Sequence, residues 1–197
     1  MIEVLDLNDV TLVGFSMGGG EVARFIGKYG EDRLHSVVFA ASVTPMMFKT
    51  DDNPDGPLDK AHADKMAAGL SEDQDTFYDT FMKEFFSKDG DAVTMMVSEE
   101  QRQEALMLCK QADKTAALAA MQSFATTDFR QDLTKVTVPT LVIHGDADGT
   151  VPYEGSGRRT HAAVAQSELL AIEGGPHGIN VSHTDEFNTA LLAFLEK

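Results

Sequence analysis

The chain has little cysteine, few basic residues and no long apolar run. Its one cysteine, Cys109, excludes an internal disulfide and is typical of a protein from a reducing compartment. The 16 lysines and arginines stand against 32 acidic residues, a net charge of −16. This charge disfavours nucleic acid and anionic membranes as partners, because both would repel the protein. No apolar stretch approaches the roughly 18 residues of a membrane-spanning helix.

The first residues also lack the features of a secretory signal. MIEVLDLND carries acidic residues where a signal peptide carries positive charge, and no long apolar segment is found there. We therefore expect a cytoplasmic protein. No cluster of metal ligands is visible either, so the sequence implies no metal and no other cofactor.

Short apolar runs rich in β-branched residues alternate with helical patterns, which predicts an α/β fold with a parallel sheet. Four buried strands are expected, at 10–15, 34–42, 138–145 and 167–173. An amphipathic helix is expected at 21–29, ending at Gly30, and a last one at 184–197.

Residues 44–134 have a different character, with helical patterns rich in methionine and phenylalanine. Residues 71–74 and 98–101 each match a capping box, so a helix is expected to begin at each. An all-helical insertion of this kind is best placed as a lid over the carboxyl ends of the strands. The chain then divides into an amino-terminal core part (1–43), the lid (44–134) and a carboxyl-terminal core part (135–197).

Gly14-Phe15-Ser16-Met17-Gly18 matches G-x-S-x-G between a predicted strand and a predicted helix. In that context the motif forms a sharp turn that exposes the serine, and glycines at 14 and 18 are expected to relieve crowding in the turn. Ser16 is therefore a candidate nucleophile. The Met17 N–H, at the start of the helix, is the candidate donor to an oxyanion.

A serine hydroxyl needs a base to take its proton and a carboxylate to orient that base. Asp146 and Asp148 follow the third predicted strand, and His177 follows the fourth, so all lie at the same edge of the sheet as Ser16. We expect Asp148 and His177 to be catalytic and Asp146 to form a turn. The other histidines are expected to be structural or exposed, with His144 shaping the acid loop.

Together, GFSMGGGEVARF, TDFRQDL, VPTLVIHGDADGTVP, the GRRT helix start and PHGINVSH resemble the bacterial non-haem chloroperoxidase-like group of α/β-hydrolases. The resemblance runs from about Leu5 to the carboxyl terminus. It implies a serine esterase that can also act as a perhydrolase, without haem or metal. It also implies a triad of Ser16, His177 and Asp148, because the acid of this group is the second aspartate of its GDxD loop.

The resemblance further implies that the amino-terminal strands of the family fold are absent from this chain, and with them the second oxyanion-hole donor. MIEVLDLNDV is expected to be the end of the helix that leads into the nucleophile strand. This leaves open a fragment of a longer enzyme, a truncated gene product, a start wrongly assigned to an internal methionine, or strands supplied by a homo-oligomer or a second chain. The expected partner is a small-molecule ester, with Phe15, Met46 and Phe124 as candidate substrate-binding residues.

Two alternatives belong to other classes of function. Residues 18–23 formally match the dinucleotide fingerprint G-x-G-x-x-A, but the next strand ends in FAASVTP, without the acid that would bind the ribose. The second alternative is a truncated, weak or inactive relative that acts as a non-catalytic or binding protein. A dehalogenase of the same fold is disfavoured because serine, not a carboxylate, occupies the turn.

Overall fold

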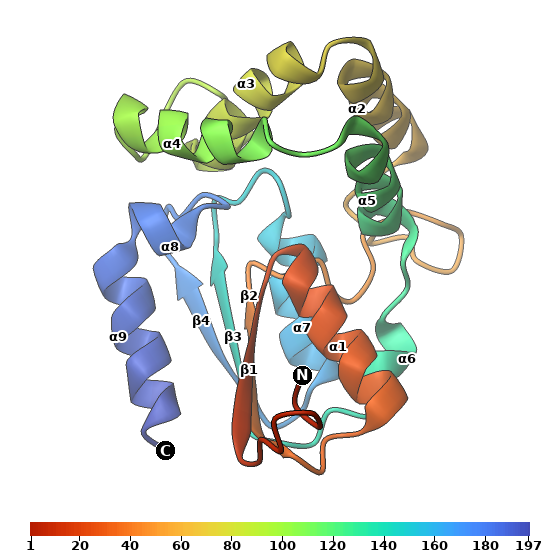
Figure 1. The fold of residues 1–197 in the computed structure, drawn as a ribbon, viewed down its shortest axis with the longest axis vertical. Coiled ribbons are helices and arrows are strands. Elements are labelled where there is room, and N and C mark those ends of the chain that lie inside the picture. The colour runs from red at the N-terminus through yellow and green to blue at the C-terminus, as the bar shows by residue number, and fades with distance from the viewer.

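A four-stranded parallel sheet forms the centre of the computed structural model, which describes all residues, Met1–Lys197 (Figure 1). In chain order and side by side, its strands are β1 (Val10–Phe15), β2 (Leu34–Ala40), β3 (Thr140–Gly145) and β4 (Ser167–Ile172). All neighbouring pairs are parallel, so the four carboxyl ends meet at one edge. The four predicted strands are confirmed. Strand β2 ends before residue 42 because Ala41 has a φ of 45°, which an extended strand does not allow.

Helices cover both faces of the sheet (Figure 1). One face carries α1 (Met17–Tyr29), α6 (Arg130–Leu133) and α7 (Gly157–Ala163), whereas the other carries α8 (Ile179–Ser182) and α9 (Thr184–Leu195). Helix α1 ends, as expected, where Gly30 adopts a φ of 78°. No helix is both long enough and apolar enough to cross a membrane.

The alternation of side chains along β2 builds the two layers of the core. Val37 and Phe39 pack with Ile26 of helix α1 on one face, whereas Val38 and Ala40 pack on the other face, where helices α8 and α9 supply apolar side chains. All four strand residues are fully buried. This explains why β2 reads as one continuous apolar run, as strands covered on both faces do.

Four further helices lie above the carboxyl ends of the strands (Figure 1). They are α2 (Lys60–Glu72), α3 (Gln74–Phe85), α4 (Glu99–Cys109) and α5 (Lys114–Thr126), and residues 60–126 are called the helical cap below. The cap has a small apolar core of its own, made by Leu70, Tyr78, Met82, Phe86 and Leu106.

The predicted helix start at Ser98 is confirmed, and the one at Ser71 is wrong. Ser98 Oγ accepts from the Gln101 N–H at 3.2 Å, and the Gln101 side chain accepts from the Ser98 N–H at 2.9 Å, which completes a capping box. Helix α2 instead continues through Ser71, and Asp73 caps α3 by accepting the Thr76 N–H at 3.1 Å. Aspartate caps a helix as well as serine does, so the motif alone did not choose between them.

The turn from β1 to α1 differs from expectation in which glycines it requires. A Cβ at Gly14 would lie 2.5 Å from the Gly18 carbonyl oxygen and 2.6 Å from the Gly19 backbone, whereas a Cβ at Gly18 would meet nothing within 4 Å. Only the first of the two motif glycines therefore relieves crowding. Between them Ser16 adopts a φ of 54°, a conformation that is strained for any residue with a side chain.

The first residues do not form the expected helix end. The Leu5 N–H donates to the Met1 carbonyl at 2.9 Å, and the Leu7 N–H donates to the Ile2 carbonyl at 2.9 Å. These bonds close a turn, but Asp6 then adopts a φ of 49°, which interrupts helical geometry before β1.

The two candidate caps give a first prediction. Ser98→Ala removes the side-chain acceptor at the start of α4 and should lower the free energy of unfolding by about 1 kcal/mol. Ser71→Ala lies inside α2 and should change that free energy by less than about 0.5 kcal/mol. Urea denaturation followed by circular dichroism measures both, and an equal loss in the two variants would contradict the assignment of the caps.

The two glycines of the turn give a second prediction. Gly14→Ala forces a methyl group against backbone and should destabilise the protein by about 1–3 kcal/mol or more. Gly18→Ala has open space and should be neutral or stabilising by up to about 1 kcal/mol, because alanine favours helix more than glycine does. Thermal unfolding of both variants checks this, and similar losses at the two positions would show that the crowding at Gly14 is not decisive.

Candidate active site

Ser16, His177 and Asp148 form a continuous chain of hydrogen bonds at the carboxyl edge of the sheet. Ser16 Oγ lies 2.9 Å from His177 Nε2, and His177 Nδ1 lies 2.6 Å from Asp148 Oδ2. The carboxylate only accepts, so Nδ1 carries the ring proton and Nε2 is free to accept from the serine hydroxyl. The three residues follow β1, β3 and β4, which explains how side chains up to 161 positions apart meet.

The Asp148 carboxylate is buried and surrounded by donors. Its Oδ1 accepts from the Thr150 N–H at 2.9 Å and the Val151 N–H at 2.7 Å, and its Oδ2 lies 3.2 Å from His144 Nε2. Burial by itself raises the pKa of Asp148, but the positive charge that His177 carries when protonated and the hydrogen bond from His144 outweigh it and lower the pKa to about 2. Asp148 is therefore an anion at neutral pH.

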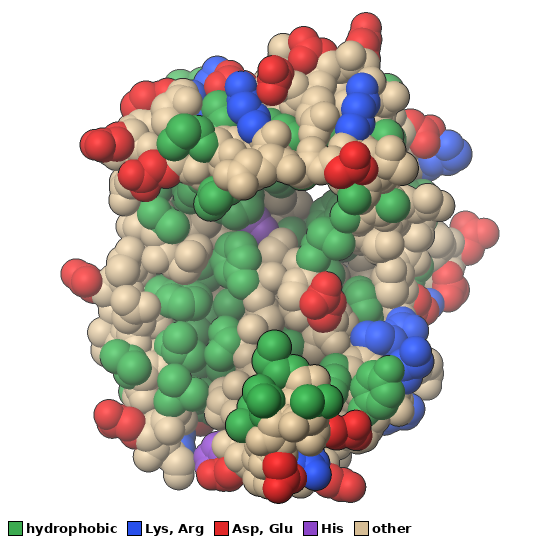
Figure 2. Space-filling model, in the orientation of Figure 1, with side chains coloured by type: hydrophobic (Ala, Val, Ile, Leu, Met, Phe, Trp, Pro, Cys, Tyr) green, Lys and Arg blue, Asp and Glu red, His purple; other side chains and the backbone are tan.

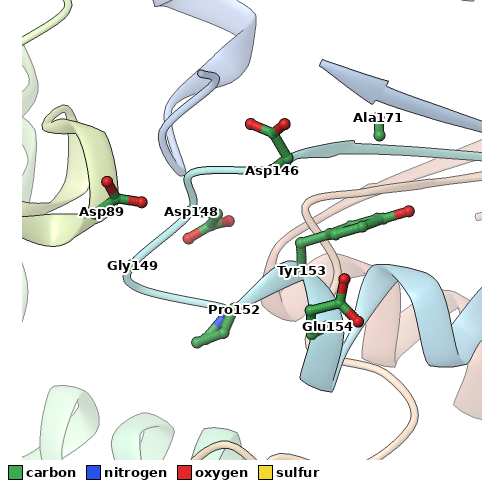
Figure 3. Close-up of a pocket in the computed structure, with 8 residues that line it drawn as sticks. All are labelled: Asp89, Asp146, Asp148, Gly149, Pro152, Tyr153, Glu154 and Ala171. Atoms are coloured by element: carbon green, nitrogen blue, oxygen red, sulfur yellow. The ribbon is translucent and has the colours of Figure 1, made fainter. Parts of the chain in front are cut away.

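Asp146 leaves the same loop but serves another purpose. Its Oδ1 accepts from the Gly174 N–H at 2.6 Å and so ties two loops together, as expected of a turn former. Figure 3 shows its side chain pointing away from that of Asp148. Both aspartates line an open pocket of about 590 Å³ together with Asp89 and Glu154. Neither Ser16 nor His177 lines this acidic pocket, so it is not the place where a reactant would meet the serine.

Two residues predicted at the site flank Ser16 in the chain. The Met17 N–H, the first of helix α1, has no acceptor within the protein, so it is available to an oxygen of a bound molecule. The Phe15 ring lies 5.3 Å from the His177 ring, measured between centroids. Phe15 therefore forms one wall of the space around the imidazole.

The adjacent wall is formed by Phe85, a residue that the sequence did not single out and whose ring lies 6.3 Å from that of Phe15 between centroids. The Phe85 ring, at the end of cap helix α3, packs edge-on against His177 with 4.7 Å between centroids. The Phe85 backbone carbonyl accepts from the Gly178 N–H at 3.1 Å, next to His177. Four residues later, the Asp89 N–H donates to the Ala147 carbonyl at 2.7 Å, next to Asp148. The segment 85–89 thus contacts both the histidine loop and the acid loop. The phenylalanine-rich pattern of α3 signalled an apolar face, but not which loop that face would meet.

Met46 and Phe124, also predicted at the site, are not among the hydrogen-bond or ring contacts of Ser16 and His177. Met46 is buried, and its carbonyl accepts from Asn53 Nδ2 at 3.3 Å. Phe124 lines a mostly apolar cavity of about 430 Å³, together with residues of α2 and α5. Figure 2 shows a hollow beneath the helical cap, with hydrophobic side chains gathered around it.

Known proteins resemble the chain over nearly its whole length. The family model described as alpha/beta hydrolase fold matches residues 2–184. A putative non-heme chloroperoxidase of Synechocystis sp. is 41% identical over 98% of this chain and 68% of its own length. A bifunctional esterase/perhydrolase of Acinetobacter calcoaceticus is 33% identical over 99% of this chain and 70% of its own length.

A solved structure agrees with these sequence relatives. The crystal structure of a bromoperoxidase from Bacillus anthracis has 48% sequence identity to the chain and superimposes with a TM-score of 0.95. It covers all of this chain, which in turn covers 70% of that structure. Together with the parallel sheet and its flanking helices, these matches confirm the resemblance read from the motifs. The chain belongs to the α/β-hydrolase fold family, with relatives in its non-heme chloroperoxidase group.

Proposed function

We propose that this protein is a serine hydrolase that cleaves small carboxylic esters through an acyl-enzyme. The observation that carries the proposal is the hydrogen-bonded chain from Ser16 through His177 to Asp148. The relatives named esterase/perhydrolase and non-heme chloroperoxidase support the same reaction class. The proposed partner is accordingly a small-molecule ester.

In the first half of the reaction, Ser16 Oγ attacks the ester carbonyl and its proton passes to His177 Nε2. The Asp148 anion stabilises the imidazolium that forms, because Nδ1–H already points at its carboxylate. The carbon–oxygen bond to the alcohol then breaks. The alcohol leaves with the proton from Nε2, and the acyl group stays on Ser16.

The negative charge that develops on the carbonyl oxygen needs a donor nearby. We assign this role to the Met17 N–H, which is unpaired and lies at the amino end of α1, where the helix dipole favours an anion. Removal of one oxyanion-hole donor costs about 10²–10³ in turnover in a well-studied hydrolase, which indicates the size of the effect expected from such a donor.

Two nucleophiles can end the reaction. Water, deprotonated by His177, releases the carboxylic acid. Hydrogen peroxide, deprotonated in the same way, attacks the acyl carbon through one of its oxygens. The bond from that carbon to Ser16 Oγ then breaks, His177 Nε2 returns the proton to Oγ, and the product is a peracid. The peracid can then oxidise halide in solution, which is how a cofactor-free hydrolase yields a haloperoxidase reaction.

Residues 44–134, which include the helical cap, are proposed to act as the lid over this site. The cap lies over the carboxyl edge of the sheet, and its Phe85 ring packs against the imidazole. Phe15 is proposed to contact the substrate next to Ser16, with Met46 and Phe124 farther out. The hydrophobic lining of the hollow in Figure 2 suits a small apolar acyl or alcohol group.

A fluorophosphonate probe tests the proposal directly. Wild-type protein should gain the mass of one probe molecule less HF, because Ser16 Oγ, made nucleophilic by the base, displaces fluoride from phosphorus and loses its proton. Ser16→Ala and His177→Ala should lose labelling, with the rate falling by at least about 10³-fold. Intact mass spectrometry over time measures both.

Exposed residues of the same types provide matched controls. Ser123→Ala on α5 and His62→Ala on α2 lie on the surface of the cap and should label at the wild-type rate. Absence of labelling in folded wild-type protein would refute an assembled nucleophile, as would equal labelling of Ser16→Ala.

Competition between water and peroxide gives a further prediction. With a short p-nitrophenyl ester, rising hydrogen peroxide should divert the acyl group from carboxylic acid to peracid, because both nucleophiles attack the same acyl-enzyme. Halogenation of a dye in the presence of bromide measures the peracid. Ser16→Ala should abolish this signal, and halogenation that persists in the variant would show that it does not pass through Ser16.

A further inference from the structure

A second histidine contacts the carboxylate that orients His177. His144, at the end of β3, is fully buried, and its Nε2 lies 3.2 Å from Asp148 Oδ2 and 2.8 Å from the Val151 carbonyl oxygen. Both neighbours are acceptors, so Nε2 carries the ring proton and shares it between them. The reaction proposed above does not use this side chain.

The rest of the His144 ring is fixed by close packing. A Cβ at Gly157 would lie 2.5 Å from His144 Nδ1, so the edge of the ring rests against the start of α7. Nδ1 itself is buried without a hydrogen-bond partner. A buried ring with one nitrogen unpaired costs free energy, and an apolar residue would avoid that cost. The contact that His144 makes through Nε2 is what an apolar residue cannot supply.

We infer that His144 is a positioning residue for the proposed hydrolysis: its Nε2–H fixes Asp148 Oδ2 toward His177 and joins the carboxylate to its own loop at Val151. The inference rests on the proposed function, because it matters only if Asp148 orients the base. Thr150 and Val151 hold Oδ1 through backbone N–H groups. His144 is the side chain other than His177 that approaches Oδ2.

The other titratable groups nearby do not replace it. The Tyr153 ring lies 5.9 Å from the His144 ring between centroids, and burial raises the pKa of its hydroxyl, so it stays neutral. Asp89, Asp146 and Glu154 share the acidic pocket with Asp148, but none of them is among the hydrogen-bond partners of its carboxylate. Loss of the His144 donor would therefore leave more negative charge on Oδ2.

Two amide substitutions separate the hydrogen bond from the volume of the ring. In His144→Gln the amide nitrogen can sit near the position of Nε2, whereas in His144→Asn it sits near Nδ1 and cannot reach Asp148. His144→Leu removes all donors. His62→Asn, an exposed histidine on α2, is the matched control.

In ester hydrolysis, His144→Asn and His144→Leu should lower kcat by about 10–100-fold, by analogy with the loss of a hydrogen-bonding partner of a metal-bound histidine, with little change in KM. The acid limb of kcat/KM should move to higher pH, because a more negative carboxylate favours the protonated imidazole. His144→Gln should recover most of the loss in kcat and return the acid limb of the kcat/KM profile to its wild-type pH.

A proton NMR spectrum separates this inference from the proposed function. The proton shared by His177 Nδ1 and Asp148 should give a far-downfield resonance that His177→Ala removes. It should shift or broaden in His144→Asn and return in His144→Gln, whether or not any ester is hydrolysed. A wild-type protein with this resonance but no hydrolysis would refute the proposed function, while the placement of the Asp148 carboxylate by His144 would still be supported if the resonance responds to His144→Asn.

Three results would overturn the inference. One is an unchanged resonance and pH profile in folded His144→Asn. Another is an equal loss of kcat in the Gln and Asn variants, which would show that the lost volume of the imidazole ring, and not its hydrogen bond, causes the effect. The third is an acid limb that stays in place while kcat falls. If His144→Leu does not fold, the comparison of Gln with Asn still decides.

Discussion

The close contact between the backbones of β1 and α1 is the constraint on which the site depends. Because Gly14 has no side chain, the first turn of α1 can fold back to within van der Waals distance of β1. The chain then passes through the strained conformation of Ser16, which is held by the Ser16 N–H to the Ala40 carbonyl at 2.8 Å and by the Val43 N–H to the Ser16 carbonyl at 3.2 Å. The strain is thus stabilised by β2 and the segment after it, and it orients Oγ toward His177.

Much of the fold could be predicted because buried parallel strands have short, continuous apolar sequences that are easy to locate. The same regularity placed Ser16, Asp148 and His177 at one edge, since each follows a different strand of the sheet. The structure adds to this prediction the hydrogen bonds that join the three side chains. The place of each residue just after a strand was sufficient to predict that the three side chains meet, because the parallel topology brings the carboxyl ends of the strands together.

What could not be predicted depends on contacts between segments. Ser71 matches a capping motif, yet the burial of Leu70 keeps the last turn of α2 helical and leaves the cap to Asp73. The need for glycine at 14 but not at 18 follows from the angle at which α1 leaves β1, which a motif does not encode. The Phe85 contact with His177 likewise depends on where the cap rests, and no pattern within α3 specifies that.

The docking of segment 85–89 has a consequence for how such a site can change over time. One backbone bond joins it to the loop of His177 and another joins it to the loop of Asp148. If the cap helices were replaced by those of a relative, the substrate preference would change. The loops of His177 and Asp148 would be displaced as well, unless residues 85–89 were kept. The outer helices α2, α4 and α5 are freer to diverge, so new specificities are more accessible through them than through the end of α3.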